Sequence, residues 1–313
     1  MRGIRGSEKN LLLLDAGDLL FKKYATPLPE NDVKGATQRA YLFIESFNRM
    51  GYDALGVGDD DLSLGKDLLV EMSKKANFPF LSSNVVDEGS GKLLFQPFLV
   101  KEVQEVRVGI FSLLGPETFL GPTDPRKKGL ILKPSTEVAQ SMVKELQSKS
   151  DFIVLLSHLG YPRDMELAQA ISGIHFIVGA HTGMNLVYPP LIKDTILLQT
   201  ATKGMYAGKL DLNVQNNASG FYNAATKRSL ENNLRNLTAR LDDKKTPEKE
   251  KAQLRKTRED AERKLKEFQG KNEFYNRILP LNEGMKEDPD MVSMIEAYKA
   301  RFPDPAKPAP PKP

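Results

Sequence analysis

Residues 151–183, DFIVLLSHLGYPRDMELAQAISGIHFIVGAHTG, decide the fold of this chain and contain all 3 of its histidines. Residues 152–156 and 175–178 are short apolar runs rich in β-branched side chains, which predicts two buried parallel strands. Residues 164–171 lie between these runs and have apolar side chains at helical spacing. The stretch therefore predicts a strand–helix–strand unit.

Two of the histidines stand just past the ends of these predicted strands. His158 lies in the turn after the first strand, and His181 lies in the turn after the second. Polar residues beyond the carboxyl ends of neighbouring parallel strands face one crevice, so we expect both histidines at one ligand site. His175 lies inside the second predicted strand, and we expect it to be a structural residue.

Composition excludes several kinds of function. The chain has 313 residues, of which 40% are hydrophobic, enough for one large domain with accessories or for two domains. It has no cysteine, which excludes disulfides and thiolate chemistry. No apolar run approaches the roughly 18 residues of a membrane span. Residues 1–10 are basic but lack the apolar segment of a signal peptide, so the residues themselves predict no location.

The net charge of +4 is unevenly distributed. Residues 227–273 contain 15 basic and 10 acidic side chains, against 45 and 41 in the whole chain, so the remainder is nearly neutral. A neutral main domain gives no support for a nucleic-acid groove, and we expect no nucleic-acid partner.

Three further predicted strands also end in polar turns. Residues 10–14 form an apolar run that ends at Asp18, and residues 51–57 form another that ends at Asp59. Residues 80–85 repeat the pattern, with Asn84 at the turn. Glycine before the aspartates allows the tight turns that place these side chains at the strand ends.

The rest of the main domain predicts alternating strands and helices. Apolar spacing predicts helices at 37–50 and 135–149, the second with Ser135 as its cap, a hairpin at 99–103 and 107–113, and strands at 196–199 and 209–214. This order is typical of an α/β (α+β) fold with a mixed sheet.

Beyond residue 223 the pattern changes to a charged helical one. Leucines at heptad-like spacing and the sequence Thr246-Pro247-Glu248, expected to cap the second helix, predict an antiparallel helical hairpin over residues 227–269, with the look of a coiled coil. The hairpin is either a solvated insertion that packs on itself or an arm that docks a protein partner. A helix capped by Asp288 is expected at 290–301.

These patterns predict four parts. Residues 1–222 form the main domain, 223–273 the helical hairpin, 274–302 a return segment with a helix that packs on the main domain, and 303–313 a Pro-rich tail.

Five polar side chains are expected to converge at one sheet edge: Asp18, Asp59, Asn84, His158 and His181. Two imidazoles and two carboxylates suit a divalent metal such as Mn, Fe or Zn. The alternative is that each polar side chain only caps its own turn. Because all of them follow predicted strands, together they favour a site.

Seven segments resemble one known family. They are LLLLDAGDLL (11–20), GYDALGVGDDDLSLG (51–65), FPFLSSNV (78–85), VRVGIFSLLGPET (106–118), DFIVLLSHLG (151–160), GIHFIVGAHTG (173–183) and LLQTATKGMYAGKLDL (197–212). In order and approximate spacing they resemble the calcineurin-like metallophosphoesterases, in the bacterial 5′-nucleotidase branch. The resemblance implies a two-layer β-sandwich flanked by helices, with a two-metal site that clamps phosphate and activates water.

The resemblance also implies roles for individual residues. Asp18 matches the carboxylate that bridges the metals, and Asp59 stands where the family has an asparagine ligand. His158 and His181 match two imidazoles of one metal. Asn84 and Asp61 are expected in the second shell or near the substrate.

Several positions depart from the family pattern. Gly183 stands in place of a histidine ligand, and the family's Asp-x-His pair is absent from this sequence, which therefore looks like a product begun downstream of the usual start. Both losses fall on the same metal, so we expect one ion. Asp60 replaces a catalytic histidine and would have to act as acid or base, although an ionised Asp60 is expected to repel phosphate.

The sequence thus leaves three hypotheses for function. The first is hydrolysis of phosphomonoesters such as nucleotides at a single metal. The second is a catalytically degenerate protein that binds a metal or ligand, and the third is an interaction scaffold that uses the hairpin. The family resemblance suggests a periplasmic or extracytoplasmic location.

Overall fold

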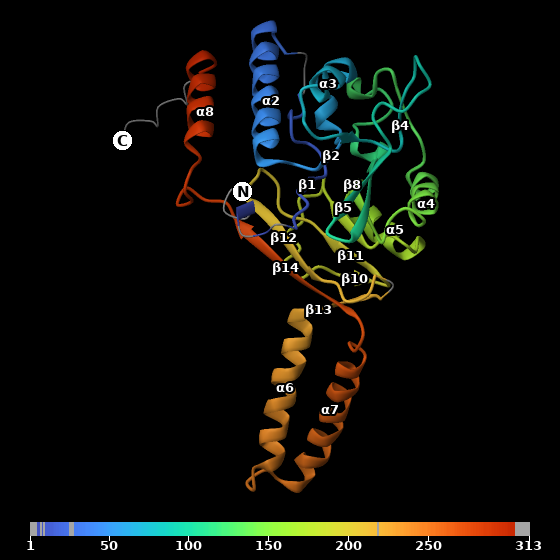
Figure 1. The fold of residues 1–313 in the computed structure, drawn as a ribbon, viewed down its shortest axis with the longest axis vertical. Helices are drawn as coiled ribbons and strands as arrows, with labels where there is room; N and C mark the ends of the chain where they lie inside the picture. The colour runs from blue at the N-terminus through green and yellow to red at the C-terminus, as the bar shows by residue number, and fades with distance from the viewer. Residues whose placement is uncertain (1–4, 7, 9, 25–27, 218, 304–313) are drawn as a thin grey trace. The chain divides into compact units, whose positions relative to one another are not determined.

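The computed structural model describes residues 5, 6, 8, 10–24, 28–217 and 219–303 (Figure 1). It divides into two compact units, Met1–Tyr206 with Pro280–Pro313, and Ala207–Leu279. The division after Tyr206 falls earlier than the expected boundary at 222. In the predicted tail, residues 304–313 lie outside the described residues.

The larger sheet of the first unit is mixed, as predicted. Its strands have the order β10-β11-β9-β8-β6-β5. The bounds are β5 (Phe98–Val103), β6 (Val106–Leu114), β8 (Phe152–His158), β9 (Phe176–Gly179), β10 (Leu191–Ile192) and β11 (Thr195–Leu198). Strands β6, β8, β9 and β11 pair in parallel, whereas β5 and β10 are antiparallel edge strands. Every residue of β8 is buried, which explains its continuous apolar run.

A smaller parallel sheet forms the second layer. It contains β1 (Leu14–Asp15), β2 (Ala54–Gly56) and β3 (Phe80–Leu81) in that order. A Cβ atom at Gly56 would lie 2.6 Å from Ser112 Oγ of β6 and 3.0 Å from Leu156 Cβ of β8. The glycine therefore lets β2 pack closely on the larger sheet, and the predicted two-layer arrangement is confirmed.

Helices and short turns complete the first unit. Its helices are α2 (Glu30–Met50), α3 (Lys66–Ser73), α4 (Ser135–Leu146), α5 (Tyr161–Ala170) and α8 (Pro289–Arg301). A ribbon pairs β4 (Val85–Asp87) with β7 (Leu130–Leu132), and 3₁₀ turns occur at η1 (Asp60–Leu62), η2 (Pro116–Thr118) and η3 (Pro125–Lys127). The expectation that Ser135 caps α4 is wrong, because Pro134 is the N-cap and Ser135 is already helical.

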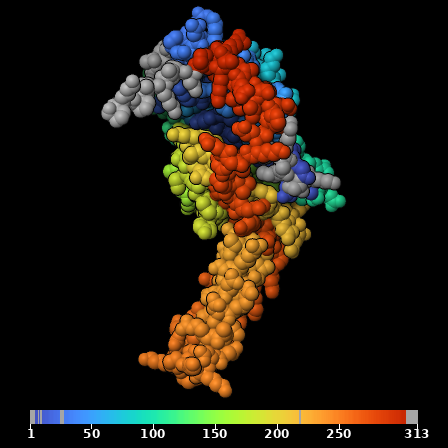
Figure 2. All heavy atoms as spheres, turned by 90° about the vertical axis from the view of Figure 1, so that its left-hand side faces the viewer, coloured from blue at the N-terminus to red at the C-terminus, as the bar shows by residue number. Residues whose placement is uncertain are grey.

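Helix α2 begins well before the predicted start at residue 37. Acidic side chains in its first turn, Glu30 and Asp32, favour a helix N-terminus. Helix α8 packs beside α2 in both views, where Tyr298 Oη donates a hydrogen bond to the Gly35 carbonyl at 3.2 Å (Figures 1 and 2). Asp288 caps α8 as predicted, since its side chain accepts from the N–H groups of Asp290 and Met291.

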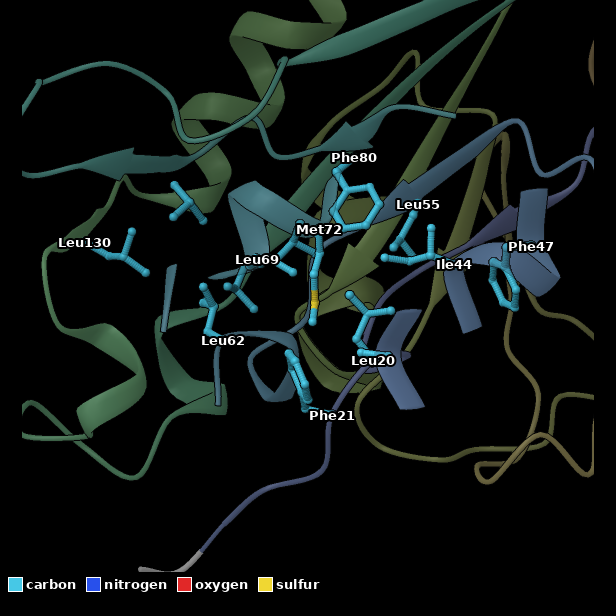
Figure 3. Packing of buried hydrophobic residues seen from close by; sticks show 14 of the residues in the cluster. Leu20, Phe21, Ile44, Phe47, Leu55, Leu62, Leu69, Met72, Phe80 and Leu130 are labelled. Atoms are coloured by element: carbon cyan, nitrogen blue, oxygen red, sulfur yellow. The ribbon is translucent and has the colours of Figure 1, made fainter. Parts of the chain in front are cut away.

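An apolar core lies under the loops that follow β1 and β2. Leu20 and Leu62 are fully buried there, with Leu55, Leu69 and Met72 (Figure 3). These side chains anchor the turns at Asp18 and Asp59, since moving either turn would expose apolar surface worth about 2 kcal/mol per side chain.

The second unit contains the helical hairpin and a small sheet. Strands β12 (Tyr206–Asn213), β14 (Asn272–Pro280) and β13 (Phe221–Asn223) lie in that order. The expected return segment therefore begins with a strand of this sheet. Helices α6 (Ala224–Asp242) and α7 (Glu248–Lys266) pack on each other and form the predicted hairpin.

The turn of the hairpin differs from the prediction. Pro247 is the N-cap of α7, and Thr246 Oγ1 instead donates to the carbonyl of Arg240 at 2.7 Å. The buried apolar residues along the two helices are Ala224, Leu237, Leu254 and Ala261. Their coiled-coil character stays a prediction.

Among the described residues, none of the helices has the length and apolarity needed to cross a membrane.

Candidate metal centre

Four of the predicted residues lie together at the ends of β1, β2, β8 and β9. Asp18 follows β1, Asp59 follows β2, His158 ends β8, and His181 follows β9. Each offers one ligand atom, and all of these atoms lie within 4.8 Å of one another. We call these four side chains the Asp–His cluster.

The backbone around the Asp–His cluster is tightly constrained. Asp18 has φ 60° and His181 has φ 69°, the left-handed region that side-chain-bearing residues rarely adopt. A Cβ atom at Gly58 would collide with Asp18 and would lie 2.8 Å from His158 Cε1. Strain of this kind is typical of functional sites, where the surrounding fold holds side chains in required positions.

His158 is fixed by its backbone partner. Its Nδ1 donates to the Ala16 carbonyl at 2.8 Å, which directs Nε2 toward the two carboxylates. Nε2 lies 3.1 Å from Asp18 Oδ2 and 3.1 Å from Asp59 Oδ1. A metal-ligating histidine commonly has such an outer partner, which sets the ring's orientation.

The charges of the cluster shift the pKa values of its members. Burial lowers the pKa of His158, but hydrogen bonds with Asp18 and Asp59 outweigh burial and raise it well above its ordinary value. Burial likewise raises the pKa of Asp59, but hydrogen bonds from both histidines and the charge of Arg126 bring it below the ordinary value. The two carboxylates thus favour the charged form of the His158 ring.

The donor set fits a divalent metal ion. The close pairs of ligand atoms are separated by 3.1, 3.1 and 3.4 Å. Ligands at about 2.1 Å in a tetrahedral site are roughly 3.4 Å apart, so only small shifts would complete a shell. The His181 side chain is 35% exposed, which leaves one side of the cluster open to solvent.

Asp61 and Asp15 add buried carboxyl groups behind the cluster. Asp61 Oδ2 accepts from the N–H groups of Asp18 and Gly58, both at 2.9 Å, and Oδ1 accepts from Leu20 N–H at 2.9 Å. Burial raises the pKa of Asp61 to about 7 and that of Asp15 to about 6. Such crowding of acidic groups favours a bound cation, and Asp61 lies where it positions Asp18.

Asn84 does not join the Asp–His cluster. It is fully buried, and its amide group donates to the carbonyls of Leu114 and Lys133 and accepts from Leu114 N–H. Leu114 is the partner of His158 in the β6–β8 pairing. Asn84 therefore braces the strand pair that carries His158, and its contact with substrate stays a prediction.

Arg126 is a charged neighbour that the sequence reasoning missed. Its Nη1 donates to Asp59 Oδ2 at 2.5 Å and to Asp60 Oδ1 at 2.6 Å, while Nε and Nη2 donate to Asp124 at 3.0 and 2.7 Å. Its side chain is only 6% exposed. The sequence Asp124-Pro125 indicates a turn, but nothing in it signals a contact with Asp59.

The ion pair corrects the expected effect of Asp60. We expected an ionised Asp60 to repel phosphate, whereas in the structure its carboxylate is paired with the cation of Arg126. Burial and the charges of Asp18 and Asp59 raise the pKa of Asp60, and Arg126 opposes this shift.

Gly183 occupies a position where histidine would be strained. Its φ is 65°, and a Cβ atom there would lie 2.8 Å from Thr202 Cγ2. The local backbone is thus suited to glycine and not to an added ligand.

Known proteins share this fold, and about a quarter of the aligned residues are identical in the first two relatives described next. No model of a known protein family matches the chain. A 5′-nucleotidase of Vibrio cholerae is 26% identical over 238 residues, which cover 66% of this chain and 41% of the relative. The structure of a 5′-nucleotidase precursor from Thermus thermophilus is 25% identical, with a TM-score of 0.63 over 96% of this chain and 51% of that one. The calcineurin-like phosphoesterase YfkN of Bacillus subtilis, 16% identical, has the same fold, with a TM-score of 0.62 over 96% of this chain and 86% of that one.

The fold matches the structures of a 5′-nucleotidase and of a calcineurin-like phosphoesterase. In sequence and fold the chain is similar to bacterial 5′-nucleotidases, and in fold it is similar to a calcineurin-like phosphoesterase. It spans about two fifths of the length of its Vibrio relative.

Proposed function

We propose that this chain is a metal-dependent phosphoesterase that hydrolyses phosphomonoesters of the nucleotide class at one metal ion. The observation that carries the proposal is the convergence of Asp18, Asp59, His158 and His181 at adjoining strand ends. The names of the relatives, 5′-nucleotidases, support nucleotides as the substrate class.

The Asp–His cluster would hold the ion, either Mn, Fe or Zn, since mixed carboxylate and imidazole ligands suit each of them. When bound, such an ion supplies Lewis-acid activation of a phosphate group and of water. Asp61 positions Asp18 through its backbone N–H, and Ala16 orients His158. Within the described residues, Gly183 adds no further ligand, which supports a single ion.

Asp60 is the proposed proton acceptor for the attacking water. It lies next to the Asp–His cluster, because its backbone N–H donates to Asp18 Oδ1 at 2.8 Å. Its side chain is 24% exposed, so part of it faces solvent at the open side of the site. The pairing with Arg126 favours the carboxylate form, which suits a base better than an acid.

The first experiment measures phosphate release. Purified protein supplied with Mn²⁺ or Zn²⁺ is expected to release inorganic phosphate from a panel of nucleoside monophosphates, and Asp18→Asn is expected to reduce the rate by about a hundredfold or more. His175→Asn, which lies outside the cluster, is the matched control and should keep the activity. Turnover that is unaffected by Asp18→Asn would contradict the proposal.

The binding partner and the cellular location are proposed only in general terms. The proposed partner is a small phosphorylated molecule. Within the described residues nothing supports a protein partner at the hairpin, whose two helices pack on each other. An extracytoplasmic location is proposed from the family resemblance, and cell fractionation would test it.

A further inference from the structure

Arg126 holds a position that the proposed reaction does not yet explain. Within the described residues its guanidinium makes four hydrogen bonds to three carboxylates, and Arg126 Cζ lies 5.3 Å from the centre of the Phe119 ring. A buried arginine keeps its charge, because its pKa is far above neutral. In the part of the chain that the structure describes, the ion-pair partners of Arg126 are acidic groups in and beside the Asp–His cluster.

We propose that Arg126 is a positioning residue that neutralises Asp60 and aims Asp59, so that a phosphate group can approach the centre. This inference rests on the proposed function in one respect, namely that the ligand is a phosphate group. It assigns to Arg126 no contact with substrate.

Asp59 shows how the aiming works. One of its oxygens, Oδ2, accepts from Arg126, and the other, Oδ1, faces His158 Nε2 at 3.1 Å and His181 Nδ1 at 3.4 Å. Because the guanidinium occupies Oδ2, a single oxygen is left to face the centre of the cluster. The arginine thereby fixes which atom of Asp59 serves as a ligand.

Asp60 shows why a cation is needed there. Its carboxylate is 24% exposed beside the cluster, whereas the Arg126 side chain is 6% exposed. An anion that enters from solvent therefore meets Asp60, and an unpaired carboxylate would repel it over a short, poorly screened distance. The hydrogen bond to Arg126 Nη1 cancels most of this repulsion.

Asp124 keeps the arginine in place. Its side chain is 1% exposed, and it binds Arg126 through two oxygens while also accepting from Leu120 N–H at 2.8 Å. This fork-to-fork pairing restricts rotation of the guanidinium. Arg126 is thus built to stay between Asp59 and Asp60 and not to swing out toward a substrate.

The test is a cycle of variants whose phosphate affinity is measured by calorimetry in saturating Mn²⁺. Arg126→Gln should weaken the binding of inorganic phosphate at least about tenfold, because it uncovers the charge of Asp60. Asp60→Asn should tighten it, since the site then carries one negative charge fewer while Arg126 keeps its bonds to Asp59 and Asp124. The double variant Arg126→Gln with Asp60→Asn should return close to the wild type. Lys128→Gln, which removes an exposed charge from the same loop, should change little.

If the two single variants change phosphate affinity in opposite directions and the double variant recovers the wild-type affinity, charge neutralisation is established. This result does not depend on whether the protein hydrolyses nucleotides. If Arg126→Gln weakens phosphate binding equally alone and in the double variant, charge neutralisation is overturned and Arg126 has only a structural role. Thermal melting of the metal-free variants gives a second readout. A destabilisation by Arg126→Gln that Asp60→Asn relieves supports the pairing, and additive effects contradict it.

Discussion

At the scale of single residues, Asp60 is a position where the family resemblance implies a different side chain. The family resemblance places a histidine there, and a carboxylate in its place adds negative charge next to Asp18 and Asp59. In the structure the cation of Arg126 compensates this charge, because its Nη1 donates a hydrogen bond to Asp60 Oδ1 at 2.6 Å. A substitution that looks disabling in the sequence therefore belongs to a pair.

His175 allows a pH prediction that does not involve the metal. Burial lowers its pKa below the ordinary value of 6.5, and its Nδ1 accepts from Ile153 N–H at 3.0 Å, so the folded protein holds it neutral. Its contribution to stability is therefore present above the unfolded pKa and is lost as the pH falls below about 6.5.

The variant His175→Asn isolates this effect, because asparagine keeps an acceptor for Ile153 N–H but does not titrate. Between pH 7.5 and 5, the free energy of unfolding should fall more steeply in the wild type than in the variant. Denaturant melts at several pH values check this, and parallel pH profiles would contradict the neutral state.

The meeting of the four residues of the Asp–His cluster could be predicted from the sequence because each lies at the end of a strand that the apolar pattern reveals. Arg126 could not, because its contacts with Asp59 and Asp60 join distant parts of the chain. Asn84 also follows a strand, yet burial commits its amide to the backbone of β6. The position of residues at strand ends thus predicts that they lie close together, but it does not predict whether a side chain faces the site or bonds to the backbone.

At the scale of elements, long apolar patterns were the most informative. The strands β6 and β8 and the hairpin helices were predicted because their periodicity is sustained. The N-terminal turns of α2 were missed, since they depend on acidic first-turn residues and on packing against α8. The sheet of β12, β14 and β13 was missed because β13 is too short to show a period.

The hairpin gives a prediction at this scale. Its flanking strands β13 and β14 pair in parallel over three residues, with Phe221 opposite Asn272, so a linker that replaces the helices only has to run back along this short pair. Replacing residues 227–269 with a short Gly/Ser linker should leave the melting temperature of the first unit unchanged within a few degrees. Circular dichroism melts would show this, whereas loss of the cooperative transition would mean that the hairpin supports the main fold.

At the scale of the whole molecule, the packing of the two sheets places the ends of four strands close together. Gly56 lets β2 approach β6 and β8, and the core around Leu20 and Leu62 holds the turns at Asp18 and Asp59. The fold class and the two-layer order were predictable from the resemblance and the strand pattern. The division after Tyr206 was not, because it depends on which sheet β12 joins.

The central claim is that the four side chains at these strand ends bind one metal ion. Metal content of purified protein, measured by elemental analysis after incubation with Mn²⁺ or Zn²⁺ and desalting, tests it most directly. We predict about one ion per chain in the wild type and in His175→Ala, and strong loss in His158→Ala and in His181→Ala. Equal metal content in all three histidine variants would contradict the account.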